Sequence, residues 1–242
     1  MNIDITFNFY SDSNGGDPDL KSPTLRKYHQ FLWHKRLPNG DFMDLSDTPA
    51  NLYLAHKSSL GSLSLGSDSI VHSYKNQVKK QWLISKIPER EVDELRNLGS
   101  TIGGYILFPN KKINDLFTIN QARGVNKYID DRFDLTLECI RRYYLGQESP
   151  LYDTLLRYKH FFDLFGSFTG YCRFFLLEDL LDENNDVKFY LPFDNFKSQP
   201  TFNGISDYLM YKKGVMDFVT SRNKRIIDYS NHSKENKISE TK

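Results

Sequence analysis

An amphipathic helix with a charged flank is the feature of this sequence that most limits its possible folds. In residues 118–144, apolar side chains recur every three or four positions: Ile129, Phe133, Leu137, Ile140 and Tyr144. That spacing places them on one face of an α-helix, which must be buried against other elements. Asn126 is a suitable N-cap for this helix, and Gly146 is a suitable residue to end it.

Charged residues flank the apolar face of this predicted helix. Asp134 and Glu138 lie one turn apart, and like charges at this spacing destabilise a helix unless a cation lies between them. Arg141 can be that cation, and Arg123 lies in the preceding loop. One interpretation is a solvated, salt-bridged flank. The other is a functional site, in which Glu138 or Asp134 is an acid, a base or a ribose ligand and the two arginines bind an anion.

A second candidate residue is His56, at the end of the predicted strand NLYLAH and before a loop rich in serine and glycine. Protein scaffolds often place working groups where a strand runs into a loop. Since histidine transfers protons near neutral pH, we expect His56 to be the acid or base of any catalytic site. A structural histidine is the alternative.

The segment 74–84 combines basic and aromatic residues, with Lys75, Lys79 and Lys80 beside Tyr74 and Trp82. This combination can bind single-stranded nucleic acid through phosphate pairing and stacking. An amphipathic surface segment is the commoner explanation. The balance of 32 basic and 31 acidic residues disfavours a protein that wraps duplex nucleic acid.

Composition predicts one α+β domain over residues 1–229, because 242 residues with 39% hydrophobic side chains suffice for one sizeable core. We expect a small, mostly antiparallel sheet with a C-terminal helical layer, and a disordered polar tail at 230–242. Alternation and turn residues predict strands at 3–9, 42–45, 51–56, 101–108, 116–119 and 187–191. Caps and periodicity predict helices at 22–34, 88–99, 126–144, 150–166, 171–181 and 202–229. The rings of Phe162, Phe165 and Phe175 are expected in the core.

Several classes of protein are disfavoured. No apolar run approaches about 20 residues, and the N-terminus has no signal-peptide pattern, so we expect a cytoplasmic protein without a membrane span. Cys139 and Cys172 are too few for a disulfide framework and lie in predicted helices, where they should be buried thiols. No spacing indicates a metal site, and no motif identifies a cofactor.

The motifs TINQARG, IDDRFDLTLECIRRYY, SPTLRKYHQFLW and LPNG together resemble a bacterial family known as a domain of unknown function, over nearly the whole chain. That resemblance implies no activity and assigns no residues. The stretch NLYLAHKSS also resembles in part the first core strand of ADP-ribosyltransferases, which bind NAD in a cleft of a split sheet. Leu54 and Ala55 interrupt the tyrosine–histidine pairing of that family, and Glu138 is predicted mid-helix rather than after a strand.

Two functions follow as hypotheses. The first is an enzyme or binder of a phosphate-bearing nucleotide or nucleic acid, with Arg123 on the phosphate, His56 as acid or base and Glu138 or Asp134 polarising a hydroxyl. The second is a non-catalytic module that binds a partner protein. The first requires these side chains to converge on one concave pocket, whereas the second predicts that they are scattered.

Overall fold

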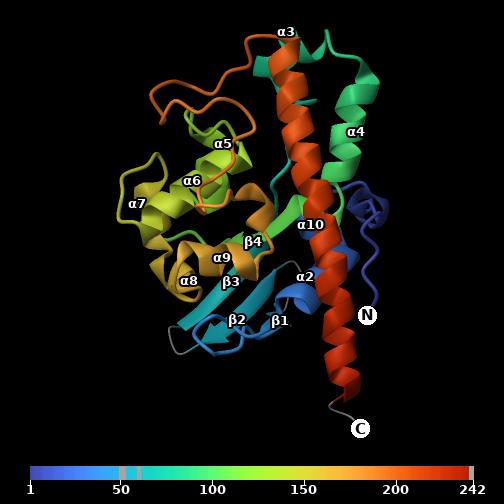
Figure 1. The fold of residues 1–242 in the computed structure, drawn as a ribbon, viewed down its shortest axis with the longest axis vertical. Coiled ribbons are helices and arrows are strands. Elements are labelled where there is room, and N and C mark those ends of the chain that lie inside the picture. The colour runs from blue at the N-terminus through green and yellow to red at the C-terminus, as the bar shows by residue number, and fades with distance from the viewer. Residues whose placement is uncertain (49–52, 59–60, 240–242) are drawn as a thin grey trace.

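A four-stranded antiparallel sheet forms the centre of the fold in the computed structural model, which describes residues 1–48, 53–58 and 61–239 (Figure 1). Within these residues the strand order is that of the chain: β1 (Leu45–Asp47), β2 (Leu54–Ser58), β3 (Gly61–Ser69) and β4 (Tyr105–Pro109). The expected α+β class with an antiparallel sheet and a C-terminal helical layer is confirmed. None of the described helices is long and apolar enough to cross a membrane.

Short helices surround the sheet, and one long helix closes the chain. The 3₁₀-helices are η1 (Phe9–Asp12), η2 (Val78–Lys80), η3 (Ile102–Gly104) and η4 (Glu178–Leu180). The α-helices before the last strand are α1 (Pro18–Lys21), α2 (Pro23–Trp33), α3 (Gln81–Ile84) and α4 (Glu89–Gly99). Those after it are α5 (Ile119–Val125), α6 (Phe133–Tyr144), α7 (Tyr152–Arg157), α8 (Lys159–Asp163), α9 (Phe168–Phe174) and α10 (Ile205–Ser239).

Helix starts follow the predicted capping signals. Ser22 caps α2, because its hydroxyl accepts a hydrogen bond from the backbone N–H of Leu25 while Pro23 occupies the first helical position. Pro88 also marks the start of α4, but it occupies the N-cap position and no side chain caps this helix. The helix α10 spans the length of the molecule, with α4 beside its N-terminal half (Figure 1).

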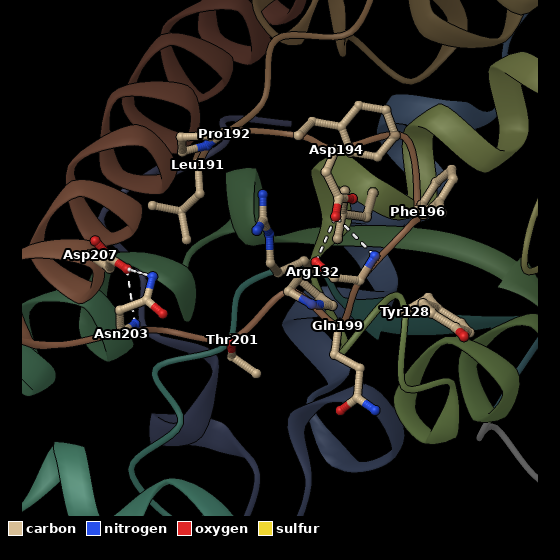
Figure 2. Close-up of a pocket in the computed structure, with 14 residues that line it drawn as sticks. Tyr128, Arg132, Leu191, Pro192, Asp194, Phe196, Gln199, Thr201, Asn203 and Asp207 are labelled. Atoms are coloured by element: carbon tan, nitrogen blue, oxygen red, sulfur yellow. Dashed lines mark hydrogen bonds between the residues drawn. The ribbon is translucent and has the colours of Figure 1, made fainter.

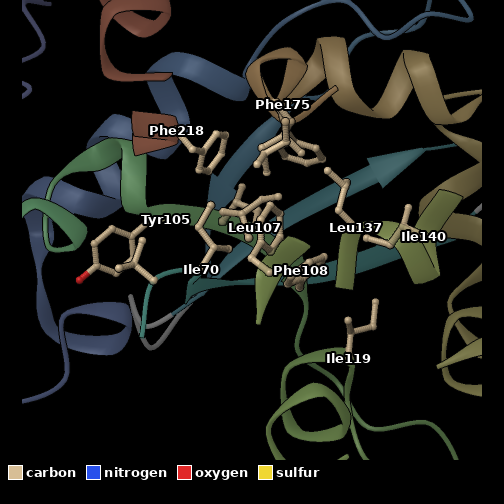
Figure 3. Close-up of a cluster of buried hydrophobic side chains, with 14 of the residues drawn as sticks. Ile70, Tyr105, Leu107, Phe108, Ile119, Leu137, Ile140, Phe175 and Phe218 are labelled. Atoms are coloured by element: carbon tan, nitrogen blue, oxygen red, sulfur yellow. The ribbon is translucent and has the colours of Figure 1, made fainter. Parts of the chain in front are cut away.

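The core lies between β4, α6 and the aromatic helices α8 and α9 (Figure 3). Phe162, Phe165 and Phe175 are all fully buried, as expected. Both cysteines are free and buried. The glycine pair before β4 permits a close approach to α10, where Asn223 accepts a hydrogen bond from the N–H of Gly103.

Three predicted strands are wrong. Residues 3–8 form no strand, because the chain instead enters η1, whose first turn is capped by the Asn8 side chain. Residues 116–119 lead into α5, where Thr118 and Gln121 form a reciprocal capping box. In residues 187–191 only Val187 forms a β-bridge, and the N–H of Tyr190 bonds to a carboxylate of α6 rather than to a strand.

Other boundaries shift. The strand expected at 42–45 is β1, three residues later, and residues 51 and 52 of the next predicted strand lie outside the described residues. The helices predicted at 150–166 and 171–181 are broken into α7 with α8 and into α9 with η4. The segment from residue 230, predicted as a disordered tail, continues α10 as far as Ser239, and Ser230 is buried.

Candidate functional site

The helix predicted at 126–144 begins only at Phe133, as α6, and its expected N-cap Asn126 instead ends α5. Between these two helices the chain turns tightly at Asp130 and Asp131. Both residues have a left-handed backbone, with φ of 49° and 62°. Aspartate tolerates this conformation better than most residues, but it still requires support from neighbouring structure. The two carboxylates of the turn reach different partners: Asp130 pairs with Lys80, and Asp131 lies against His72 and Arg123.

Arg123 joins this turn to the sheet from a fully buried position in α5. Its guanidinium donates hydrogen bonds to the carboxylate of Asp68 on β3 (2.8 Å), to the carbonyl of Ser69 (2.9 Å) and to the carbonyl of Asp131 (3.1 Å). Burial lowers the pKa of Arg123, but the Asp68 and Asp131 carboxylates outweigh burial and raise it. The arginine predicted to bind a ligand anion is therefore surrounded by groups of the protein itself.

His72 lies on the other side of Asp131. Its Nε2 is 3.2 Å from a carboxylate oxygen of Asp131, and its side chain is 29% exposed. The exposed part lines a cavity of about 300 Å³, the histidine cavity, together with Tyr10, Arg96 and Tyr105. Burial lowers the pKa of His72, and Asp131 opposes that shift, so the ring favours the neutral form in the folded protein.

Lys80 borders a second cavity of about 290 Å³, the lysine cavity. Its ammonium bonds to Asp130 and lies 4.8 Å from the ring centroids of both Tyr74 and Phe202. Tyr74 has a left-handed backbone with φ of 59°, and its hydroxyl donates to the carbonyl of Asp130. The other side chains around this cavity include Lys79, Trp82, Lys127, Gln77 and Asn126, together with the aliphatic Leu83 and Val125.

A third cavity, of about 300 Å³, lies between the start of α6 and the segment 191–203 (Figure 2). Arg132 lies among the side chains around it, but its guanidinium is bonded to Asp134. Two acids, Asp194 and Asp207 at the start of α10, border this cavity and accept hydrogen bonds from the N–H groups of Ser198 and Asn203. Because the lining carries these two carboxylates and Arg132 is already paired, this cavity does not favour an anion.

The structure places His56 far from the other predicted site residues. It is buried on β2, with Nδ1 3.2 Å from the carbonyl oxygen of Asp44. In the sheet His56 faces Leu63 of β3, five residues before Asp68. At the rise of a strand, that separation is about 16 Å.

The predicted acids also have structural partners. Asp134 is fully buried and accepts hydrogen bonds from Arg132 and from the N–H of Tyr190. Glu138 is buried and accepts from Arg141 (2.8 Å) and from the guanidinium of Arg142 (2.7 Å). Arg141 was expected between Asp134 and Glu138, but it pairs with Glu138 and not with Asp134, whose partner is Arg132. The structure gathers neither these acids nor His56 around Arg123.

The residues that surround Arg123 formed no recognisable group in the sequence. His72 stands in a short loop with no motif around it, and no motif marks Asp68 on β3. The adjacent acids Asp130 and Asp131 are also typical of the first turn of a helix, so the sequence did not indicate the left-handed turn that they form. Across the described ranges, no three histidine, cysteine or acidic side chains are arranged to hold a metal ion.

Comparison with known proteins places this chain in a family without an assigned activity. The model of DUF6994, a family of unknown function, matches residues 3–226, so the chain belongs to that family. No curated protein and no solved structure matches the chain.

Proposed function

We propose that this protein binds a phosphate-bearing ligand with an aromatic ring, of the nucleotide class, in the lysine cavity. The observation that carries this proposal is the convergence of Lys79, Lys80, Lys127 and Trp82 on one cavity of about 290 Å³. Such a volume lies at the small end of the range typical of ligand sites, roughly 300–1,000 Å³.

The charge around the lysine cavity favours an anion. Asp130 is its one acidic lining residue among those described, and Lys80 already neutralises it. Lys79 and Lys127 are exposed, and neither forms an ion pair with a residue in the described ranges. Two uncompensated ammonium groups at one cavity attract phosphate oxygens.

Trp82 supplies the second part of the recognition. Its side chain is 53% exposed and borders the same cavity. An aromatic base that stacks on such a ring gains roughly 1–3 kcal/mol. The basic and aromatic segment 74–84 thus combines phosphate pairing with stacking.

The wall of this cavity is preorganised. Lys80 is fixed by Asp130 and by two aromatic rings, and both Asp130 and Tyr74 have left-handed backbones. Strained backbone of this kind costs about 1–3 kcal/mol per residue and is concentrated at functional sites. A wall that is fixed before binding lowers the entropy lost when a ligand is bound.

Calorimetric titration with AMP, ATP, adenosine and inorganic phosphate tests the proposal. We expect the nucleotides to bind, Lys127→Ala to weaken them by about tenfold, and Trp82→Ala to weaken nucleotides but not inorganic phosphate. Lys213→Ala removes an exposed lysine of α10 that pairs with Asp217, and it serves as the matched control without effect. Absence of binding to all four compounds, or equal loss in the control, contradicts the proposal.

A non-catalytic protein-interaction module is the second candidate. The observation favouring it is a shallow hollow bordered by Leu116, Phe117 and Val125, whose side chains are all exposed. Exposed apolar side chains grouped in this way are typical of interaction surfaces. On this hypothesis, Phe117→Asp abolishes association with a partner protein, while Trp82→Ala and Lys127→Ala have no effect on it.

A further inference from the structure

We propose that the histidine cavity is a second site, in which His72 is a general base toward a hydroxyl group of a small anionic ligand whose charge is bound by Arg96. This site does not depend on the lysine cavity. Of the residues described around the two, only Gln77 borders both.

The charge of Asp131 favours the tautomer required of a base. Nε2 of His72 is buried and lies 3.2 Å from the Asp131 carboxylate without a hydrogen bond between them, so the negative charge favours a proton on Nε2. Nδ1 then carries the lone pair. Since the ring borders the cavity and is 29% exposed, it can accept a proton from a ligand there.

Arg123, which is buried, holds Asp131 in place beside His72. Its Nε is 3.4 Å from the Asp131 carboxylate, and its Nη2 donates to the Asp131 carbonyl, so the turn and its carboxylate are held in place. The charged groups that act on His72 are Asp131, Asp130 and Arg123. When His72 gains a proton, the new positive charge lies against Asp131, which stabilises the imidazolium.

Arg96 supplies the anion-binding group. It lies on α4, borders the same cavity and stacks 5.0 Å from the ring centroid of Tyr10. Among the described residues it has no acidic partner, whereas Lys75, the other cation at this cavity, is held by Glu89 and Asp93. A free guanidinium suits a phosphate or carboxylate through its paired N–H groups.

The proposed step is a proton transfer. The O–H bond of the ligand hydroxyl breaks, the proton joins Nδ1 of His72, and the electron pair stays on the ligand oxygen. The ligand class is therefore a small molecule that carries both an anionic group and a hydroxyl group, for which ribose 5-phosphate is a suitable probe.

Modification by diethyl pyrocarbonate, followed residue by residue with peptide mass spectrometry, tests the state of His72. This reagent forms a bond to a neutral imidazole nitrogen and releases ethanol and carbon dioxide. Because the pKa of His72 is lowered, its rate should fall less between pH 7.5 and pH 5.5 than the rate of a histidine in an unfolded peptide, whose pKa is near 6.5. Parallel pH profiles for His72 and the peptide overturn the proposal.

Protection by ribose 5-phosphate tests the ligand site. We expect 10 mM of the probe, roughly ten times a dissociation constant near 1 mM, to slow modification of His72 by about tenfold while His232 is unaffected. Arg96→Met should abolish the protection. Arg90→Met, which removes another exposed arginine of α4, should keep it. Absence of protection, or equal protection in Arg96→Met, overturns the proposal.

Two further variants separate this site from other roles. Asp131→Asn should slow modification of His72 several-fold at pH 7.5 if the carboxylate activates the ring. An unchanged rate overturns the proposed role of Asp131. If Asp131→Asn fails to fold, the protection measured on Arg96→Met still tests the ligand site. Trp82→Ala should leave the ribose 5-phosphate protection intact, so failure of the lysine cavity and failure of this site are distinguishable.

Discussion

Replacing Arg123 by methionine should strongly destabilise the protein. Methionine keeps much of the side-chain volume but removes every hydrogen bond to Asp68, Ser69 and Asp131. Asp68 is only 4% exposed, and Arg123 is its ion-pair partner in the described residues. Burial raises the pKa of Asp68 to about 8 against the attraction of Arg123, so this carboxyl group depends on the arginine as its donor. Removing one partner of such a buried pair costs about 3–5 kcal/mol, chiefly because the other group is left buried without a partner.

Urea denaturation at pH 7, followed by circular dichroism, measures this cost. The double variant Arg123→Met with Asp68→Asn should recover about 1–3 kcal/mol of the loss, because it removes the unpaired carboxyl group as well. Lys159→Met serves as the control. It breaks the exposed pair with Asp163 and should cost less than about 1 kcal/mol.

A loss below about 1 kcal/mol in Arg123→Met would refute this reasoning, since such a value is typical of exposed pairs. If the same variant folded normally but lost nucleotide binding, Arg123 would instead be the ligand-binding residue that its position in a charged segment first indicated. Measuring both quantities on one variant therefore separates a structural role from a binding role.

Two further predictions concern the core. Burial lowers the pKa of His29 to about 3, below the value near 6.5 of an unfolded histidine. The neutral ring therefore contributes stability that is complete above pH 6.5 and is lost as the pH falls toward 3. Unfolding free energies at pH 7.5 and pH 4.5 should show His29→Gln losing roughly 2–3 kcal/mol less than the parent, and equal losses would contradict this. Phe162→Ala should cost about 3–5 kcal/mol in urea denaturation, because the ring is fully buried among the rings of Phe161 and Tyr171; a cost near zero would mean that the cavity collapses.

Local signals in the sequence predicted the elements that local interactions decide. The Ser22 cap and Pro88 mark helix starts because capping depends on residues within one turn. The rings of α8 and α9 were placed in the core by hydrophobicity alone. Residues 3–9 alternate like a strand, but a strand also needs a free sheet edge, and no local pattern reports where that edge is.

The candidate site depended on contacts distant in sequence. Arg123 was recognised as an unusual charge, but its partner Asp68 lies 55 residues away. Periodicity continued unbroken from Ile129 through Phe133, so it concealed the turn between them. Two side chains pair with the acids of this turn. Lys80 comes from the segment 74–84, whose pattern predicted only a basic, aromatic surface, and His72 lies just before that segment.

The left-handed turn before α6 allows two neighbouring acids to contact residues of two different cavities. On a continuous helix, Asp130 and Asp131 would project roughly 100° apart from one rod. In the left-handed turn, Asp130 reaches Lys80 at the lysine cavity, and Asp131 reaches His72 at the histidine cavity. The chain is nearly neutral overall, with 32 basic and 31 acidic residues, so its net charge does not indicate an anionic ligand. The arrangement of charge does, because these acids neutralise Lys80 and hold His72, while Lys127 at the lysine cavity and Arg96 at the histidine cavity form no ion pair with any residue in the described ranges.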